Sequence, residues 1–195
     1  MSTMSTMATG WGRQEVIASR GARRTIGLAA FVIATALSAY VVVPLPVTPV
    51  PVTLQPLVVL LAGLVLGPWL GASAMVAYLG VGISGVPVFA GGGAGLPWLL
   101  GPTGGYLMAF PAAAFLAGRL AGGAGAHWAR IVVACLAGLA ALYLGGVSQL
   151  LVVTGQDLST AVTMGVIPFL LGDVLKVAVA TVIATRIRDR GLQLF

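Results

Sequence analysis

Charged residues are scarce in this sequence. Ten Lys or Arg and four Asp or Glu make up 7% of its 195 residues, whereas a soluble domain carries about 25%. Hydrophobic residues make up 59%, and the mean hydropathy is +1.08. This composition excludes an ordinary soluble domain. It predicts a polytopic integral membrane protein that folds, at this length, as a single all-α bundle.

Cysteine and histidine each occur once, as Cys135 and His127. A single cysteine excludes an intramolecular disulfide, and a single histidine argues against a histidine-based metal site. We therefore expect neither a metal nor a cofactor. The net charge is +6, but the basic residues are divided among the ends of apolar segments and form no basic face. For this reason we do not expect nucleic acid as a partner.

A phosphate-binding loop is also missing. Glycine-rich segments occur at residues 91–95 and 101–105, but neither is followed by the Gly-Lys-Ser/Thr of a nucleotide-binding loop. The sequence thus has no visible nucleotide site. If the protein moves a solute uphill, the energy must come from an ion gradient or from another subunit.

What the sequence does contain is a series of apolar stretches after a polar, basic segment at residues 1–24. The stretches are 25–43, 54–67, 69–84, 103–120, 129–153 and 161–185. A membrane-spanning helix needs ~20 residues, and the pair Gly67 and Pro68 predicts a tight turn after the short second stretch. We predict that residues 25–195 form six transmembrane helices, which places both termini on the same side.

The basic residues are distributed asymmetrically about these six helices. Nine of the ten fall on one side of the membrane: Arg13, Arg20, Arg23, Arg24, Arg119, Arg130, Arg186, Arg188 and Arg190. The positive-inside rule then predicts that both termini are cytoplasmic and that residues 1–24 are a cytoplasmic tail. The alternative is a cleaved secretory signal that begins at Arg23 and Arg24. However, the apolar run continues past the possible cleavage site at Ala34–Ala36 as far as Val43. Losing this helix would also break the asymmetric distribution of the basic residues.

The tenth basic residue, Lys176, lies three residues after Asp173 in the last apolar stretch. This spacing puts both side chains on one face of a helix. A charge in the hydrocarbon core costs at least ~2.5–3.5 kcal/mol on insertion scales, so such residues normally face a cavity or a partner. We predict that the pair binds a small polar ligand carrying both N–H and carbonyl or carboxylate groups. A structural ion pair and a proton relay are the alternatives.

Two uncharged loops are expected on the outer side, above this pair. Residues 44–53 are rich in proline, which predicts an extended and stiff segment. Residues 85–101 are rich in glycine and lie between the apolar residues Phe89 and Trp98. This second loop is too apolar for disorder, and structureless loops of such length are usually functional. We therefore predict that it is a lid, although an ordinary surface or re-entrant loop is also possible.

Small residues recur every four positions in the first apolar stretch, at Ala30, Ala34 and Ser38. Such a face lets helices approach closely. It fits either packing inside the bundle or docking to another membrane protein. Three tyrosines are expected to be packing residues and not ligand contacts: Tyr40, Tyr78 and Tyr143.

Five segments, taken in order, resemble the BioY family, the substrate-binding subunits of biotin transporters in energy-coupling-factor (ECF) systems. The segments are residues 49–55, 60–68, 85–90, 101–107 and 168–176. The resemblance implies a six-helix subunit, not an enzyme, that binds biotin from the outside with high affinity. It also implies a multi-pass protein of the bacterial inner membrane that pairs with a membrane coupling subunit and two cytoplasmic ATPases.

The resemblance also suggests roles for individual residues. Asp173 would accept a hydrogen bond from a ureido N–H of biotin, and Lys176 would bind either the ureido carbonyl or the tail carboxylate. The other expected contacts are Thr53, Gln55, Phe89 and Tyr106. Three rival interpretations stay open: a proton-coupled secondary transporter with Asp173 as relay, a ligand-free scaffold subunit, and the same fold with a different vitamin.

Overall fold

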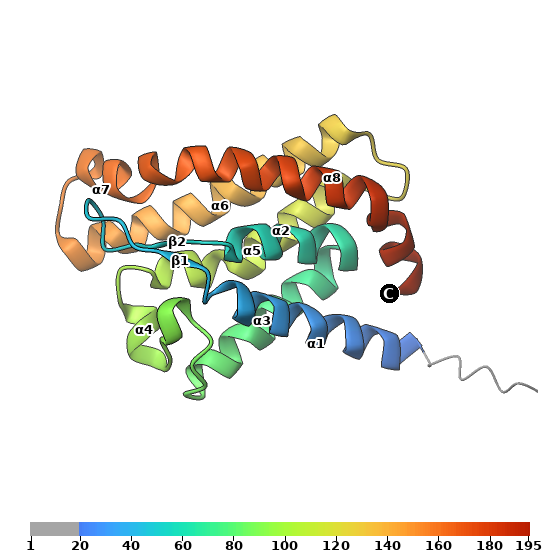
Figure 1. The fold of residues 1–195 in the computed structure, drawn as a ribbon, viewed down its shortest axis with the longest axis horizontal. Coiled ribbons are helices and arrows are strands. Elements are labelled where there is room, and N and C mark those ends of the chain that lie inside the picture. Colours follow the sequence, from blue (N-terminus) through green and yellow to red (C-terminus); the bar gives the residue numbers. More distant parts are fainter. Residues whose placement is uncertain (1–19) are drawn as a thin grey trace, which may run out of the picture.

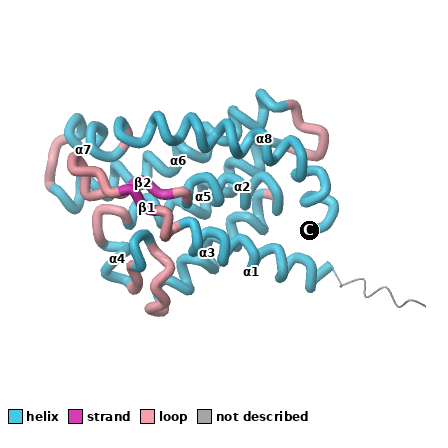
Figure 2. Tube along the Cα trace, viewed as in Figure 1, coloured by secondary structure: helices cyan, strands magenta, loops and turns pink. Residues whose placement is uncertain are grey.

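The computed structural model describes residues 20–195, and this part of the chain is predominantly helical (Figures 1 and 2). The helices are α1 (Arg20–Ser38), α2 (Gln55–Leu66), α3 (Pro68–Ile83), α4 (Leu96–Leu100), α5 (Gly104–Ala121), α6 (Trp128–Thr154), α7 (Leu158–Gly165) and α8 (Leu170–Leu194). The all-α prediction is confirmed for the described residues. Residues 1–19, which include Arg13 and most of the predicted cytoplasmic tail, lie outside them.

Six of these helices correspond to the six apolar stretches of the sequence: α1, α2, α3, α5, α6 and α8. By length and composition, two helical segments of the described chain are able to cross a membrane, Trp128–Thr154 and Leu158–Leu194, while α2 and α3 are apolar but shorter. Helix α2 ends at Leu66, and after Gly67 the next helix, α3, begins at Pro68. Helix α2 lies inside the bundle, where it contacts α1, α3, α5, α6 and α8. Eight of its twelve residues are buried.

The last apolar stretch is not a single helix, contrary to the prediction. Helix α7 ends at Gly165, and a 3-10 turn, η2 (Ile167–Phe169), separates it from α8. Pro168 lies in this turn and disfavours a helical conformation in the residue before it. The break is important for the site, because it places Asp173 in the first turn of α8 and not in the middle of a long helix.

The two loops predicted for the outer side, called the first and second outer loops, carry short regular elements. In the first loop, strands β1 (Val42–Val43) and β2 (Val52–Thr53) pair antiparallel, so residues 44–51 reverse direction as the turn of a hairpin and do not form one extended segment. The second loop was expected to lack secondary structure, but it contains a 3-10 turn, η1 (Ala90–Gly92), and the short helix α4. Pro97 within the first two positions of α4 favours a helix start there.

Close helix contacts depend on glycine at two places in the core. A Cβ at Gly63 of α2 would lie 1.9 Å from the Ala114 carbonyl oxygen of α5, and a Cβ at Gly105 of α5 would lie 2.1 Å from the Gly145 carbonyl oxygen of α6. A backbone can pack this closely against a neighbour only where no side chain intervenes. These contacts fix α5 between α2 and α6, and therefore fix the walls of the site described below.

The bundle has two distinct ends (Figure 1). The start of α1, the α5–α6 loop and the C-terminus lie at one end, and the β1–β2 hairpin, α4 and α7 lie at the other. At the first end, the buried Arg188 of α8 donates hydrogen bonds to the carbonyl oxygens of Gly122 and Gly123. The neighbouring Asp189 carboxylate accepts one from the Gly125 N–H at 3.0 Å. We call this set of contacts between α8 and the α5–α6 loop the α8 latch.

Candidate ligand-binding site

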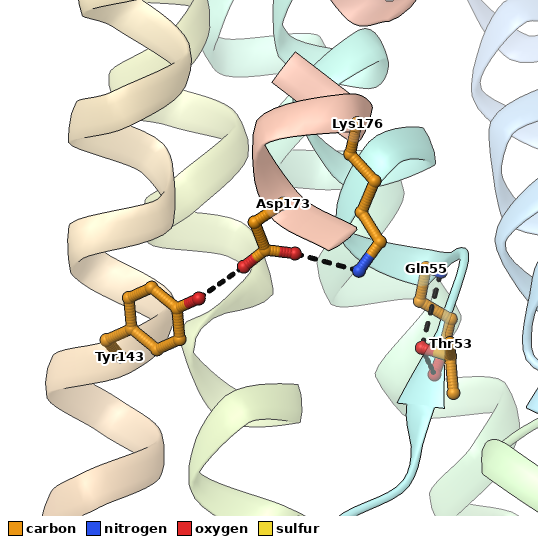
Figure 3. Close-up of polar contacts among 5 residues, drawn as sticks. All are labelled: Thr53, Gln55, Tyr143, Asp173 and Lys176. Atoms are coloured by element: carbon orange, nitrogen blue, oxygen red, sulfur yellow. Dashed lines mark hydrogen bonds and ion pairs between the residues drawn. The ribbon is translucent and has the colours of Figure 1, made fainter. Parts of the chain in front are cut away.

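Asp173 and Lys176 form a buried ion pair in the first two turns of α8. Each residue is only 5% exposed, and the Lys176 Nζ lies 2.8 Å from the Asp173 Oδ1 (Figure 3). The hydroxyl of Tyr143, on α6, donates a hydrogen bond to Oδ2, the other carboxylate oxygen. A carboxylate oxygen accepts more than one hydrogen bond, and an ammonium group has three N–H donors. The pair can therefore bind one further donor and one further acceptor.

This pair lies at a cavity of about 60 Å³. The cavity is lined by Val50, Pro51, Thr53, Gln55, Pro56, Ala90, Trp98, Thr103, Tyr106, Leu107, Phe110, Leu142, Tyr143, Phe169, Asp173 and Lys176. Among these lining residues only Asp173 and Lys176 are charged, and most of the remainder are apolar or aromatic. Such a cavity suits a ligand with a compact polar group on an apolar framework.

Gln55 connects the first outer loop to the second through Tyr78 of α3. The Gln55 Nε2 donates to the Tyr78 hydroxyl at 2.6 Å, and that hydroxyl donates to the Val88 carbonyl oxygen at 2.8 Å. The Thr53 hydroxyl in turn donates to the Gln55 Oε1 at 3.3 Å (Figure 3). Thr53 and Gln55 both line the cavity, so this network holds part of its wall in place.

The two aromatic residues predicted for the site have different positions. Tyr106 lines the cavity, and its hydroxyl donates to the Gly165 carbonyl oxygen at 2.6 Å. Phe89 does not line it. The Phe89 ring is fully buried between Gly82, where an added Cβ would lie 2.0 Å from it, and Tyr78. The expectation that Phe89 contacts the ligand is therefore corrected: its ring anchors the second loop on α3.

The sequence reasoning missed Tyr143, which it interpreted as a packing residue, and it gave no contact role to Trp98 or Thr103. Tyr143 comes from a helix thirty residues away in the chain from the carboxylate that it contacts. One general signal was available, because a tyrosine inside an apolar helix usually finds a hydrogen-bond partner when buried. That rule identifies a need for a partner but not which partner.

A second cavity, of about 370 Å³, adjoins the first at the loop end of the bundle. We call it the outer cavity. It is lined by Val42, Pro44, Leu45, Thr48, Pro49, Pro51, Ala90, Gly91, Pro97, Trp98, Gly101, Pro102 and Thr103. Four of these residues also line the first cavity: Pro51, Ala90, Trp98 and Thr103. No charged side chain is among the residues that line the outer cavity.

The small residues of α1 are only partly available for docking. Ala30 is exposed, Ala34 is half-buried, and Ser38 is buried with its hydroxyl donating to the Thr35 carbonyl oxygen at 2.8 Å. Ala30 and Ala34 therefore contribute to an open face of α1, which also carries the exposed side chains of Ile33 and Leu37. Ser38 packs inside the bundle.

Comparisons with known proteins give results that agree with one another. The sequence matches the model of the BioY family over residues 5–192. It is 42% identical over 161 residues to a probable biotin transporter BioY of Pyrococcus horikoshii, covering 83% of this chain and 93% of that protein. It is 38% identical over 146 residues to the biotin transporter BioY of Thermotoga maritima, covering 75% and 85%.

A solved structure has the same fold. It is the S-component for biotin from an ECF-type ABC transporter, which superposes with a TM-score of 0.79 at 26% sequence identity. The match covers 87% of this chain and 92% of that one.

Proposed function

This chain belongs to the BioY family, and from that premise we propose that it is the biotin-binding S-component of an ECF transporter. Its relatives are biotin transporters, so the protein is a transport subunit and not an enzyme. Its role is to bind biotin on the outer side of the cytoplasmic membrane and to take part in its uptake.

The observation that carries the proposal is a buried carboxylate beside a buried ammonium in a cavity that is otherwise uncharged. Biotin combines a ureido ring, which has two N–H donors and a carbonyl acceptor, with an apolar thioether ring and a carboxylated tail. Asp173 can accept from a ureido N–H, and Lys176 can donate to an oxygen of the ligand. The apolar and aromatic walls suit the thioether ring.

The size of the cavity indicates that binding involves movement. A space of 60 Å³ accommodates only a few waters at about 10–15 Å³ each, which is less than a bicyclic ligand occupies. Pro51 of the first outer loop belongs to the walls of both cavities, and so do two residues of the second outer loop, Ala90 and Trp98. We propose that the second outer loop is the lid, and that it moves outward to admit biotin.

The orientation and partners follow from the distribution of charge. The described arginines lie on α1, the ends of α5 and α6, and the end of α8, all at one end of the bundle. We assign this end to the cytoplasm, with six transmembrane helices and both termini inside. A solved relative is an S-component of an ECF-type ABC transporter, which supports a membrane coupling subunit and two ATPases as the proposed source of energy. Ala30 and Ala34 on α1 form the proposed contact face for the coupling subunit.

Thermal unfolding of the purified protein tests the substrate. Biotin at 100 times its dissociation constant adds ~2.7 kcal/mol of stability, so the unfolding temperature should rise clearly. Other water-soluble vitamins at the same concentration are the control. A rise with another vitamin and none with biotin would overturn the substrate assignment while leaving the fold and the family intact.

A further inference from the structure

Gln149 of α6 lines neither the first cavity nor the outer cavity, yet its side chain fastens the short helix α4 to the bundle. Resting on the proposed function, we propose that Gln149 is a positioning residue for biotin binding. By holding the C-terminal end of α4 against α6, its amide keeps the second outer loop closed over the ligand site. Gln149 therefore sets how fast biotin enters and leaves the site, while the equilibrium affinity stays nearly the same.

Three backbone carbonyl oxygens at the end of α4 converge on this one side chain. The Gln149 Nε2 donates to the Leu100 oxygen at 3.2 Å. The Leu99 and Gly101 oxygens each lie 3.4 Å from the same nitrogen. The last carbonyl groups of a helix have no partner within that helix, and an amide nitrogen has two N–H donors to offer them. We call these contacts the α4 clasp.

Little else holds α4 in place. Of its five residues only Leu99 is buried, and the other four are exposed. In the part of the chain that the structure describes, Gln149 is the one side chain that donates a hydrogen bond to α4. The preceding segment is loosely packed, because a Cβ at Gly91 or Gly92 would meet no atom within 4 Å. The α4 clasp and the burial of Leu99 are therefore the main contacts that keep this helix on the bundle.

The other side of the clasp is rigid. An added Cβ at Gly105 of α5 would lie 2.4 Å from the Gln149 Cβ, so the base of the Gln149 side chain lies directly on the α5 backbone. The contact between Gly105 and Gly145 brings α5 and α6 equally close at this level. The α4 clasp thus joins a lightly held helix to a closely packed helix pair.

Trp98 connects the α4 clasp to the ligand site. This residue precedes Leu99 in α4 and belongs to the wall that the first cavity and the outer cavity share. Its indole ring lies on Gly93, where an added Cβ would be 2.3 Å from the ring. With the clasp formed, Trp98 is held in the shared wall. When α4 leaves α6, Trp98 leaves with it, and the first cavity opens toward the outer cavity.

The kinetic consequence follows because no ligand atom takes part in the α4 clasp. The clasp stabilises the closed loop to the same extent with and without biotin, and a contact that does not distinguish the two forms shifts no binding equilibrium. It does lower the fraction of molecules in which the loop is open. Since the proposed lid must open for biotin to pass, the clasp slows association and dissociation by the same factor.

Binding kinetics of the full-length purified protein test this inference. Gln149→Met keeps the length of the side chain and removes the donor. We expect association, measured by stopped-flow fluorescence, and dissociation, measured by displacement of radiolabelled biotin, each to become about fivefold faster, the factor for loss of one ordinary hydrogen bond. The dissociation constant from calorimetry should change by less than about twofold. Gln156→Met is the matched control, because Gln156 is exposed in the α6–α7 loop, and its two rates should equal those of the wild type.

Gln149→Glu provides a second, graded test. Glutamate has the shape of glutamine but turns acceptor oxygens toward three carbonyl oxygens, so both rates should rise further than in Gln149→Met. Without biotin, both variants should unfold at nearly the wild-type temperature, because α4 is a largely exposed element. A large drop would make Gln149 a residue of general packing and overturn the inference.

Two kinetic results would also overturn the inference and leave the proposed function standing. One is unchanged rates in both Gln149 variants. The other is faster dissociation at an unchanged association rate, which would mean that Gln149 stabilises the bound form alone. If biotin does not bind to the wild-type protein, the proposed function fails, and this inference fails with it.

Discussion

Asp173 is held in place by two donors before any ligand arrives. Lys176 of the same helix bonds one carboxylate oxygen, and Tyr143 of α6 bonds the other. The carboxylate therefore cannot rotate freely about its terminal bond, and its remaining acceptor positions point in defined directions. Preorganisation of this kind lowers the cost of ordering the site on binding.

Replacing the carboxylate tests whether Asp173 is a ligand contact. Asp173→Asn should weaken biotin binding by about 10- to 150-fold, because a hydrogen bond to a charged group contributes about 1.5–3 kcal/mol. Asp157→Asn is the control. Asp157 caps α7 by accepting from the Thr160 N–H, and asparagine caps equally well. Hydrogen bonding with the side chain and then the backbone of Thr160 lowers the pKa of the Asp157 carboxyl. Similar losses for both variants by calorimetry would refute the buried site.

The hydroxyl of Tyr143 should contribute less, and in a specific way. Tyr143→Phe keeps the ring and removes one donor to Asp173, so biotin binding should weaken by about fivefold, or ~1 kcal/mol. Tyr40→Phe is the comparison, because the Tyr40 hydroxyl also donates a hydrogen bond, to the Pro87 carbonyl oxygen, but its side chain is exposed. If the Tyr143 variant binds normally, the tyrosine is a packing residue, as the sequence suggested.

Among single residues, the sequence identified those whose charge is unusual in an apolar segment, and it missed those of a type that is common there. Asp173 and Lys176 are charges in an apolar run, so hydropathy alone identified them. Tyr143 and Trp98 are ordinary residues of an apolar segment, and only the three-dimensional structure shows that they line the cavity. Phe89 was expected in the site because of its place in the loop, but its side chain faces α3.

Among the elements, α2 and α5 depend on their close approach at Gly63. Gly63→Ala should destabilise the bundle by ~1–3 kcal/mol, because the added methyl group overlaps the Ala114 carbonyl oxygen and forces the helices apart. Gly80→Ala is the matched control, since a Cβ at Gly80 of α3 meets no atom within 4 Å. That variant should be neutral or up to ~1 kcal/mol more stable, owing to the better helix propensity of alanine. Thermal unfolding in detergent distinguishes the two, and equal stabilities would contradict the packing described.

The long helices could be predicted because apolar length is a direct requirement of the bilayer. The interruptions could not be placed with the same accuracy. The break between α7 and α8 and the short helix α4 arise from local backbone preferences around Pro168 and Pro97, combined with packing against the rest of the bundle. The mean hydropathy over a window of residues averages over both the break and the short helix, so it reveals neither.

For the molecule as a whole, the proposed orientation can be tested with single cysteines. Cys135 is fully buried and can be replaced by alanine. In that background, Val47→Cys should react with a membrane-impermeant maleimide added to intact cells, because Val47 is exposed in the first outer loop. Ala124→Cys, exposed in the α5–α6 loop, should react only after the cells are permeabilised. The reverse pattern of labelling would show that the two ends of the bundle face the opposite sides of the membrane from those proposed.

The α8 latch has a consequence for the length of α8. Asp173 and Arg188 are fifteen residues apart on one continuous helix, or ~22 Å at 1.5 Å per residue. The side chain at each end must point in a set direction around the helix axis: the Asp173 carboxylate must face the cavity, and the Arg188 guanidinium must face the α5–α6 loop. A single inserted residue would rotate one end against the other by ~100°, so no placement of the helix would satisfy both. The number of residues between Asp173 and Arg188 is therefore fixed, and this segment should tolerate substitutions much better than insertions or deletions.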